Sequence, residues 1–273
     1  MAIGALLPVV SVPQFLPTVQ ALTHELDAAG YQLILGQTGY DRAREAALLT
    51  TMISRRVDAI VVAGLLDPQG SVERLRRAGI PVVETWDLTD RPVDMLVGFS
   101  HLKVGSAVAG YFLAKGWRRV GVATADDERA RDRHAGFVSA IGHAVPTAMV
   151  KAPSNVRLGR QALAELLTKA PDLRAVCCSS DGLAEGVMIE AQARGLKIPE
   201  QLAVCGFGDA DFAAHLVPSL TTVRIEGAEI GRRAALMIVA RCRGEEVDEK
   251  IVDLGFSIVE RESTGGLTAQ SIR

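Results

Sequence analysis

Residues 203–211, which read Ala-Val-Cys-Gly-Phe-Gly-Asp-Ala-Asp, decide the predicted fold of this 273-residue chain. The first three form a short apolar run typical of a buried strand, and Gly206 and Gly208 allow a sharp backbone turn at its carboxyl end. Asp209 then falls on the loop beyond the strand, where open α/β sheets hold their ligands. From Pro218 the sequence is typical of an extended segment that crosses from one lobe to another. We therefore expect a binding cleft between two lobes.

Apolar runs that suit buried strands alternate with stretches of helical spacing along the rest of the chain. The run Ile3–Val9 precedes a helix that ends at Gly30, and further strand-like runs follow at Tyr31–Leu35 and Asp58–Gly64. Strands that are apolar along their whole length favour a parallel sheet covered by helices on both faces. Because the same pattern restarts after Gly116, we predict an α/β protein with two Rossmann-like lobes and a lobe boundary near that residue.

The late segments of the chain are predicted to complete both lobes rather than to form a third domain. We assign residues 1–116 plus 222–247 to an N-terminal lobe, and residues 117–221 plus 248–273 to a C-terminal lobe. No long linker separates the lobes, so short crossings must join them.

Composition excludes several classes of protein. Thirty basic and 32 acidic residues give a formal net charge of −2, whereas a free-standing nucleic-acid binder usually carries a basic excess. No apolar run is long enough to span a bilayer, so we expect no membrane partner. The four cysteines lack CxxC spacing and are expected to be reduced, and Gly4 and Pro8 interrupt any export signal. These features favour a cytoplasmic location.

Polar and aromatic side chains follow the predicted strands and should gather at one edge of each sheet. Amides, hydroxyls, carboxylates and aromatic faces together suit a sugar-like ligand, and the arginines could clamp a carboxylate or phosphate. The predicted ligand-binding residues are Phe15, Gln37, Tyr40, Trp86, Ser100, Arg131, Arg133, Ser180, Asp181, Phe207 and Asp209.

These residues have different expected roles. Arg133, with Arg131 as second choice, is expected to anchor the ligand, while Phe15 and Trp86 cover its apolar face. Hydrogen bonds to ligand hydroxyls are expected from Gln37, Ser100, Ser180 and Asp209. Asp181 has a structural alternative, because an aspartate before a helix commonly serves as its N-cap.

Enzymatic motifs are missing from the sequence. It contains no G-x-S-x-G elbow, no GxxxxGK[ST] loop and no HExxH, and its five histidines are scattered. The acidic stretch Asp126–Glu128 could be imagined as a cation site, but a solvated loop is favoured because the regular spacing of a metal loop is absent. We therefore expect no enzyme, no catalytic residue, no metal and no cofactor.

Several stretches in a fixed order resemble one known family. They are Ala29–Leu33, Arg55–Ile60, Ala78–Val83, Gly116–Val120, Arg133–Phe137, Ile198–Val204 and Pro218–Arg224. Over residues 2–262 the chain is similar to the ligand-sensing region of bacterial LacI/GalR-family transcription repressors. The resemblance implies a periplasmic-binding-protein-like fold, with two Rossmann-like lobes joined by three crossings and a small-molecule effector between them. It also implies a homodimer whose lobe closure repositions N-terminal DNA-binding headpieces.

The chain departs from this family at two places. Members begin with a helix-turn-helix and a hinge helix, whereas the first predicted strand starts at Ile3. We therefore expect operator DNA to be a partner only through a headpiece absent here, either cut away or lost in nature. At Gly208 many members carry an acidic residue that bonds a sugar hydroxyl, so either Asp209 takes over this role or the ligand is anionic.

The nearest branch suggests an effector. The combination of Glu84–Leu88 with Gly206–Asp209 resembles gluconate-utilisation repressors, so a sugar acid such as gluconate is the first candidate. A transport-type sugar-binding protein with the same fold is the alternative, although the reduced cysteines and the missing export signal count against it. A sugar-modifying enzyme is a more distant alternative.

Overall fold

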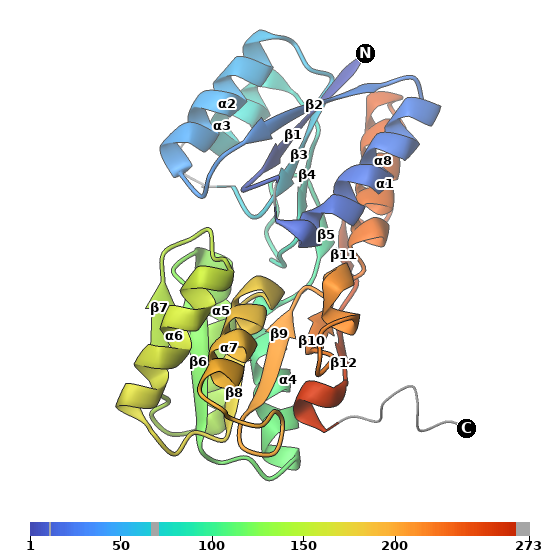
Figure 1. Cartoon of the computed structure of the whole chain (residues 1–273). Coiled ribbons are helices and arrows are strands. Elements are labelled where there is room, and N and C mark those ends of the chain that lie inside the picture. Colours follow the sequence, from blue (N-terminus) through green and yellow to red (C-terminus); the bar gives the residue numbers. More distant parts are fainter. Residues whose placement is uncertain (11, 67–70, 266–273) are drawn as a thin grey trace, which may run out of the picture. The chain divides into compact units, whose positions relative to one another are not determined.

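The computed structural model describes residues 1–10, 12–66 and 71–265 of the chain (Figure 1). It divides into two compact units, each made of two stretches of sequence. Unit 1 comprises Met1–Ser100 and Glu226–Gly255, and unit 2 comprises His101–Ile225 and Phe256–Arg273. The chain therefore passes between the units three times.

Unit 1 is built on a six-stranded parallel sheet with the strand order β11-β5-β4-β3-β1-β2. Its strands are β1 (Ala2–Leu7), β2 (Gln32–Gln37), β3 (Ala59–Ala63), β4 (Val82–Thr85), β5 (Met95–Gly98) and β11 (Ile251–Asp253). Its helices are η1 (Pro13–Phe15), α1 (Leu16–Ala28), α2 (Arg42–Ser54), α3 (Ser71–Ala78) and α8 (Gly227–Cys242). Helices α1 and α8 pack together on one side of the sheet, and α2 and α3 lie on the other (Figure 1).

Unit 2 repeats this plan with the strand order β12-β10-β9-β8-β6-β7, in which only the pairing of β12 with β10 is antiparallel. Its strands are β6 (Val120–Ala125), β7 (Thr147–Val150), β8 (Ala175–Cys178), β9 (Ala203–Phe207), β10 (Thr221–Arg224) and β12 (Ser257–Val259). Its helices are α4 (His101–Ala114), α5 (Glu128–Ile141), α6 (Val156–Lys169), α7 (Asp181–Ala193), η2 (Asp211–Ala214) and η3 (Glu262–Thr264).

Close helix packing in unit 2 depends on glycine. A Cβ atom on Gly105 of α4 would lie 1.9 Å from the carbonyl oxygen of Arg133, and one on Gly136 of α5 would lie 2.0 Å from that of Leu102. Because neither position has room for a side chain, α4 and α5 touch through their backbones. This contact holds the backbone of Arg133 against α4.

The predicted α/β architecture with two parallel-dominated sheets is confirmed. The structure places two segments differently from the predicted lobe boundaries. Helix α4 packs on α5 and belongs to unit 2, so the first boundary lies at Ser100 rather than near Gly116. Strand β11 pairs with β5 in unit 1, although residues 248–273 were assigned to the C-terminal lobe. The last eight of those residues, 266–273, lie outside the described part of the chain.

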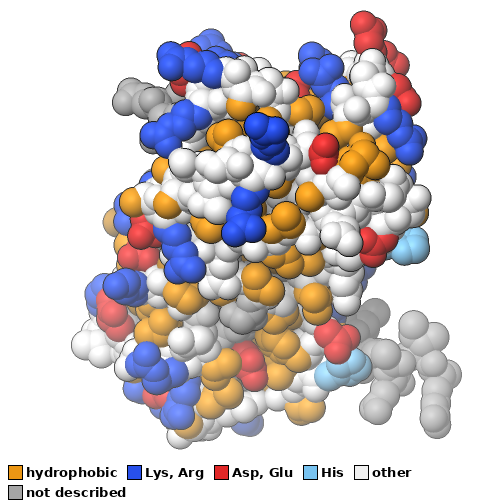
Figure 2. All heavy atoms as spheres, turned by 90° about the horizontal axis from the view of Figure 1, so that it is seen from above, with side chains coloured by type: hydrophobic (Ala, Val, Ile, Leu, Met, Phe, Trp, Pro, Cys, Tyr) orange, Lys and Arg blue, Asp and Glu red, His pale blue; other side chains and the backbone are white. Residues whose placement is uncertain are grey.

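The surface carries charges of both signs. Basic and acidic side chains are interspersed with hydrophobic ones on the face shown in Figure 2, as expected from the formal net charge of −2. Across residues 1–10, 12–66 and 71–265, no helix combines the length and apolar character needed to cross a membrane.

Candidate ligand-binding site

Arg133 is held in place at the carboxyl edge of the unit 2 sheet. Its guanidinium carbon lies 4.0 Å from the ring centroid of Phe207, the last residue of β9. Nη1 lies 2.8 Å from Nδ1 of His101, and Nη2 donates to the carbonyl oxygen of Ser179 at 3.0 Å. Stacking on an aromatic face and fixed hydrogen bonds hold the planar fork of donors in one orientation. The half-buried Arg133 is therefore pre-organised to bind a planar anion such as a carboxylate.

A space of about 330 Å³ that includes open solvent lies in unit 2 beside Arg133 and Phe207, and its closed part has room for only about one water molecule. Its walls are mainly apolar and include Val104, Phe137 and Cys177. The polar residues among these walls are Thr124, Arg133, His134 and Ser179.

Ser180 and Asp181 are both engaged within unit 2. Ser180 is the N-cap of α7, and its Oγ accepts from the Leu183 amide at 3.2 Å. Asp181 is 3% exposed; its Oδ1 accepts from Thr222 Oγ1 at 2.6 Å and its Oδ2 from the Ala210 amide at 2.7 Å. Asp181 thus ties the start of α7 to β10 and to the loop after β9, and Ser180, not Asp181, is the helix cap.

Burial raises the pKa of Asp181 from 3.8 to about 6, against the lowering effect of its hydrogen bonds to Thr222 and Ala210. Ionising this carboxyl therefore costs more in the folded state than in the unfolded state. Its protonated form contributes stability that is fully present below pH 3.8 and is lost as the pH rises through about 6. The shift corresponds to a contribution on the order of 2–3 kcal/mol.

Asp181→Asn should remove this dependence on pH. We expect the difference in unfolding free energy, variant minus wild type, to become more positive between pH 4 and pH 7, as measured by urea unfolding. Asp172→Asn is the control, because Asp172 lies on the surface with its side chain 62% exposed. Parallel pH profiles for Asp181→Asn and the wild type would contradict the assignment.

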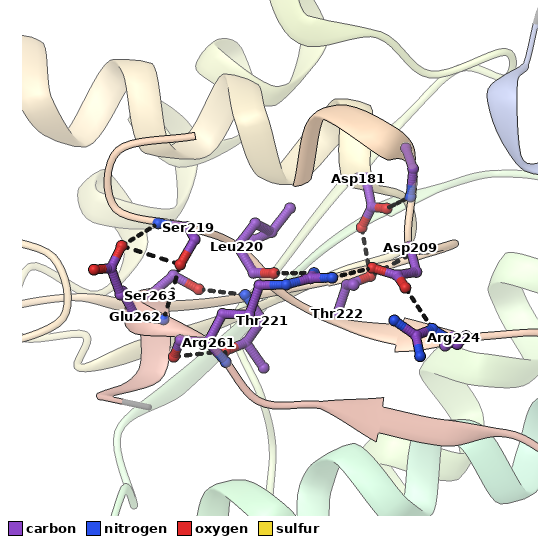
Figure 3. Close-up of polar contacts among 11 residues, drawn as sticks. Asp181, Asp209, Ser219, Leu220, Thr221, Thr222, Arg224, Arg261, Glu262 and Ser263 are labelled. Carbon is purple, nitrogen blue, oxygen red and sulfur yellow. Dashed lines mark hydrogen bonds and ion pairs between the residues drawn. The ribbon is translucent and has the colours of Figure 1, made fainter. Parts of the chain in front are cut away.

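Asp209 also has internal partners. Its Oδ2 accepts from Arg224 Nε at 2.6 Å and its Oδ1 from Arg261 Nη2 at 2.7 Å (Figure 3). The backbone of Asp209 has a φ of 48°, in the left-handed region, and its amide lies 3.3 Å from Thr222 Oγ1. Two ion pairs on one carboxylate leave it poorly suited to the predicted role of bonding ligand hydroxyls.

Phe15 and Trp86 belong to an aromatic cluster inside unit 1. Their ring centroids are 4.8 Å apart, and Phe99 lies 5.9 Å from Trp86. Trp86 Nε1 donates to Thr18 Oγ1 at 3.0 Å, and that hydroxyl donates to the carbonyl oxygen of Gly227 at 2.8 Å. Phe15 and Trp86 are each 1% exposed, so they pack inside unit 1 and offer almost no accessible face.

The remaining predicted residues are more accessible. Gln37 is exposed at the end of β2, while Tyr40 and Ser100 are half-buried on the loops that follow β2 and β5. Arg131 is exposed, and its Nε donates to the Asp126 carbonyl oxygen at 2.9 Å. Direct binding by these four residues stays a prediction.

Four residues of the unit 2 network were missing from the predicted set: His101, Thr222, Arg224 and Arg261. His101 directly follows Ser100, which is in the predicted set, so its position after a predicted strand could have identified it as well. Arg261 lies 52 residues beyond Asp209 in the sequence, and no spacing rule links the two.

The acidic stretch after β6 has structural roles. Asp126 Oδ1 accepts from the Ala152 amide at 2.7 Å, and Asp127 is the N-cap of α5. Within the described ranges, no group of three or more His, Cys, Asp or Glu side chains could hold a metal ion.

Comparisons with known proteins place the chain in a family. The model of the periplasmic binding protein-like domain matches residues 109–264. The HTH-type transcriptional regulator GntR of Pseudomonas aeruginosa is 32% identical over 96% of this chain and 78% of its own length. The HTH-type transcriptional regulator IdnR of Escherichia coli is 29% identical over 94% of this chain and 79% of its own length.

Solved structures agree with these relatives. The transcription regulator GntR from Chromobacterium violaceum superposes with a TM-score of 0.93 at 33% identity, covering 97% of this chain and 100% of the other. A LacI family transcriptional regulator from Silicibacter pomeroyi superposes with a TM-score of 0.90 at 30% identity, covering 96% and 98%. Members of this family bind small-molecule effectors and operator DNA and are generally dimeric. The chain therefore belongs to the LacI family of transcriptional regulators and comprises the effector-binding region.

Proposed function

We propose that this chain senses a sugar acid, with gluconate as the first candidate, and that Arg133 binds the acid's carboxylate. The observation that carries the proposal is the fixed guanidinium of Arg133, with Phe207 beneath it and His101 and the Ser179 carbonyl at its edge. The similarity of the chain to the regulators named GntR and IdnR supports the same class of effector.

The carboxylates on and near loop 207–210 already have internal partners, which also favours an anionic ligand. Gly208 carries no side chain where many family members have an acidic residue, and Asp181 and Asp209 are engaged by internal donors. A carboxylate ligand therefore meets less repulsion beside Phe207 than it would beside an unpaired aspartate. Gln37, Tyr40 and Ser100 are the proposed donors and acceptors for hydroxyl groups, and Arg131 is the second-choice anchor that the variants described in the Discussion test.

Effector binding regulates transcription only if the effector has different affinities for two conformations of the regulator. We propose that the sugar acid stabilises one conformation and thereby changes operator binding by the intact protein. Enzymatic turnover is not part of this proposal, because the relatives are transcriptional regulators. For the same reason the transport-type alternative is not favoured, and we place the protein in the cytoplasm with its DNA.

A homodimer is proposed for this chain, as is general in the family. Exposed apolar side chains on the edge strand β2, Ile34 at 40% and Leu35 at 44% exposure, support such pairing, because an uncovered edge strand favours association. A sedimentation mass of twice the chain's 29.0 kDa is the expected result, and a monomer at micromolar concentration would contradict it.

A thermal-shift screen tests the proposed effector class. A ligand that binds only the folded state raises the melting temperature by mass action, with a stabilisation of about 2.7 kcal/mol at 100 times its Kd. We expect gluconate and related sugar acids to raise the melting temperature and neutral hexoses to leave it unchanged. A response confined to neutral sugars would refute the carboxylate anchor.

A further inference from the structure

Asp209 is the centre of a polar network in which each of its carboxylate oxygens meets a different arginine (Figure 3). The side chains of Asp209 and Arg261 are only 10% and 15% exposed, so solvent screens this ion pair weakly. Arg224 is 45% exposed, and its ion pair with Asp209 is more accessible. Removing one member of a shielded pair leaves the other charge without compensation, so the network resists local opening.

The loop that carries Asp209 also supports the proposed anchor. Phe207, two residues earlier, stacks beneath the guanidinium of Arg133. The Gly208 amide donates to the Val223 carbonyl oxygen at 2.9 Å, and the Ala210 amide donates to Asp181. Movement of the loop must therefore disturb either the anchor or strand β10.

The two arginines lie within a few residues, along the chain, of two points at which it passes between the units. Arg224 is the last residue of β10, and the chain enters unit 1 at Glu226. Arg261 follows β12, which begins just after the chain has returned to unit 2 at Phe256. Arg261 is fixed further, because its amide donates to Thr221 Oγ1 at 2.7 Å and its Nη1 to the Leu220 carbonyl oxygen at 2.8 Å. Asp209 thus joins one loop to two of the three connections.

We propose that Asp209 is a positioning residue that ties the loop 207–210 to both connecting segments, so that loop and segments open and move as one cooperative unit. A change imposed on the loop is then passed to the residues at which the chain crosses between units. The sequence predicts Asp209 as a ligand contact, whereas its two internal ion pairs favour this positioning role. The proposed function above matters only for how this unit responds to an effector. The role of Asp209 without a ligand does not depend on it.

Native-state hydrogen exchange in low concentrations of urea tests the tie without any ligand. In the wild type, the amides of Gly208 and Arg261 should exchange with the same dependence on urea, because one opening exposes both. Asp209→Asn keeps the side chain's size but removes its charge, so both amides should exchange about tenfold faster or more and lose their common dependence. Asp172→Asn, which breaks the exposed ion pair with Arg119, should leave both unchanged.

Two outcomes overturn the proposal. In one, the two amides already exchange independently in the wild type. In the other, Asp209→Asn leaves their exchange unchanged or accelerates it equally throughout unit 2, as a general loss of stability would. If Asp209→Asn does not fold, Arg224→Gln breaks only the more exposed pair. Because the Asp209–Arg261 pair remains, Gly208 and Arg261 should then exchange faster but keep a common dependence on urea. Independent exchange of the two amides, or unaltered exchange of both, would overturn the proposal.

Adding D-gluconate separates this proposal from the proposed function. In the wild type, gluconate should slow exchange at Gly208 and Arg261 together, and in Asp209→Asn it should protect Gly208 alone. Equal protection of both amides in the variant would overturn the tie. If gluconate does not bind the wild type, the proposed effector is wrong, while the exchange pattern without ligand still decides the role of Asp209.

Discussion

Arg133→Ala is expected to weaken gluconate binding about 100-fold, since truncating one partner of a desolvated, hydrogen-bonded charge pair commonly costs 2–5 kcal/mol. The structure gives the reason: the guanidinium is already fixed by Phe207, His101 and Ser179, so the wild type loses little side-chain entropy on binding. Calorimetric titration of the variant with D-gluconate measures the loss directly.

Matched variants separate a specific anchor from general positive charge. Arg131→Ala removes an exposed arginine two residues away and should change the Kd less than about threefold, because exposed charges are screened. Arg133→Lys keeps the charge but not the bidentate geometry, so its affinity for gluconate should lie between those of the wild type and Arg133→Ala. Equal gluconate affinity in Arg133→Ala and the wild type would show that the carboxylate binds elsewhere.

Gly105→Ala is expected to have the largest effect on stability. The added Cβ would lie 1.9 Å from the Arg133 carbonyl oxygen and 2.7 Å from the Phe137 amide nitrogen, both of them backbone atoms. Relief of this overlap requires α4 and α5 to separate, which we expect to cost about 3 kcal/mol and to lower the melting temperature by about 5–10 °C. Gluconate affinity should fall as well, because Arg133 would move with its helix.

Gly110 provides the control on the same helix. A Cβ there would meet no atom within 4 Å, so Gly110→Ala should raise stability by about 0.5–1 kcal/mol through helix propensity alone. Thermal unfolding of the two variants and the wild type checks the expected loss of stability in Gly105→Ala and the expected gain in Gly110→Ala. A loss of stability in both variants, or in neither, would refute the tight α4–α5 contact.

The fold could be predicted from sequence because its signals are local. Apolar runs such as Ile3–Val9 and the glycines that end helices, among them Gly30, identify strands and helices one at a time. The lobe boundary could not be placed in this way. Helix α4 follows a strand of unit 1 in the sequence, but its glycine-mediated contact with α5 and the hydrogen bond between its Tyr111 and Thr264 place it in unit 2.

The sequence indicates some neighbours of the candidate site but not their partners. Loops at the carboxyl ends of strands could be found from the sequence, and Arg133 and Phe207 do meet there. The roles of Asp181 and Asp209 depend on Thr222, Arg224 and Arg261, which are 15 to 52 residues away from them in the chain. Pairings over such separations are set by tertiary packing and leave no periodic signal. Burial of Phe15 and Trp86 is equally a property of the folded unit.

The central claim is that this chain recognises a sugar acid through its carboxylate at Arg133. The most direct test is calorimetric titration of the wild type with D-gluconate and with D-glucitol, which has the same six-carbon chain but a hydroxymethyl group in place of the carboxylate. We predict that gluconate binds and that glucitol binds about 100-fold more weakly or not at all. Equal affinity for the two compounds, or binding of glucitol alone, would contradict the claim.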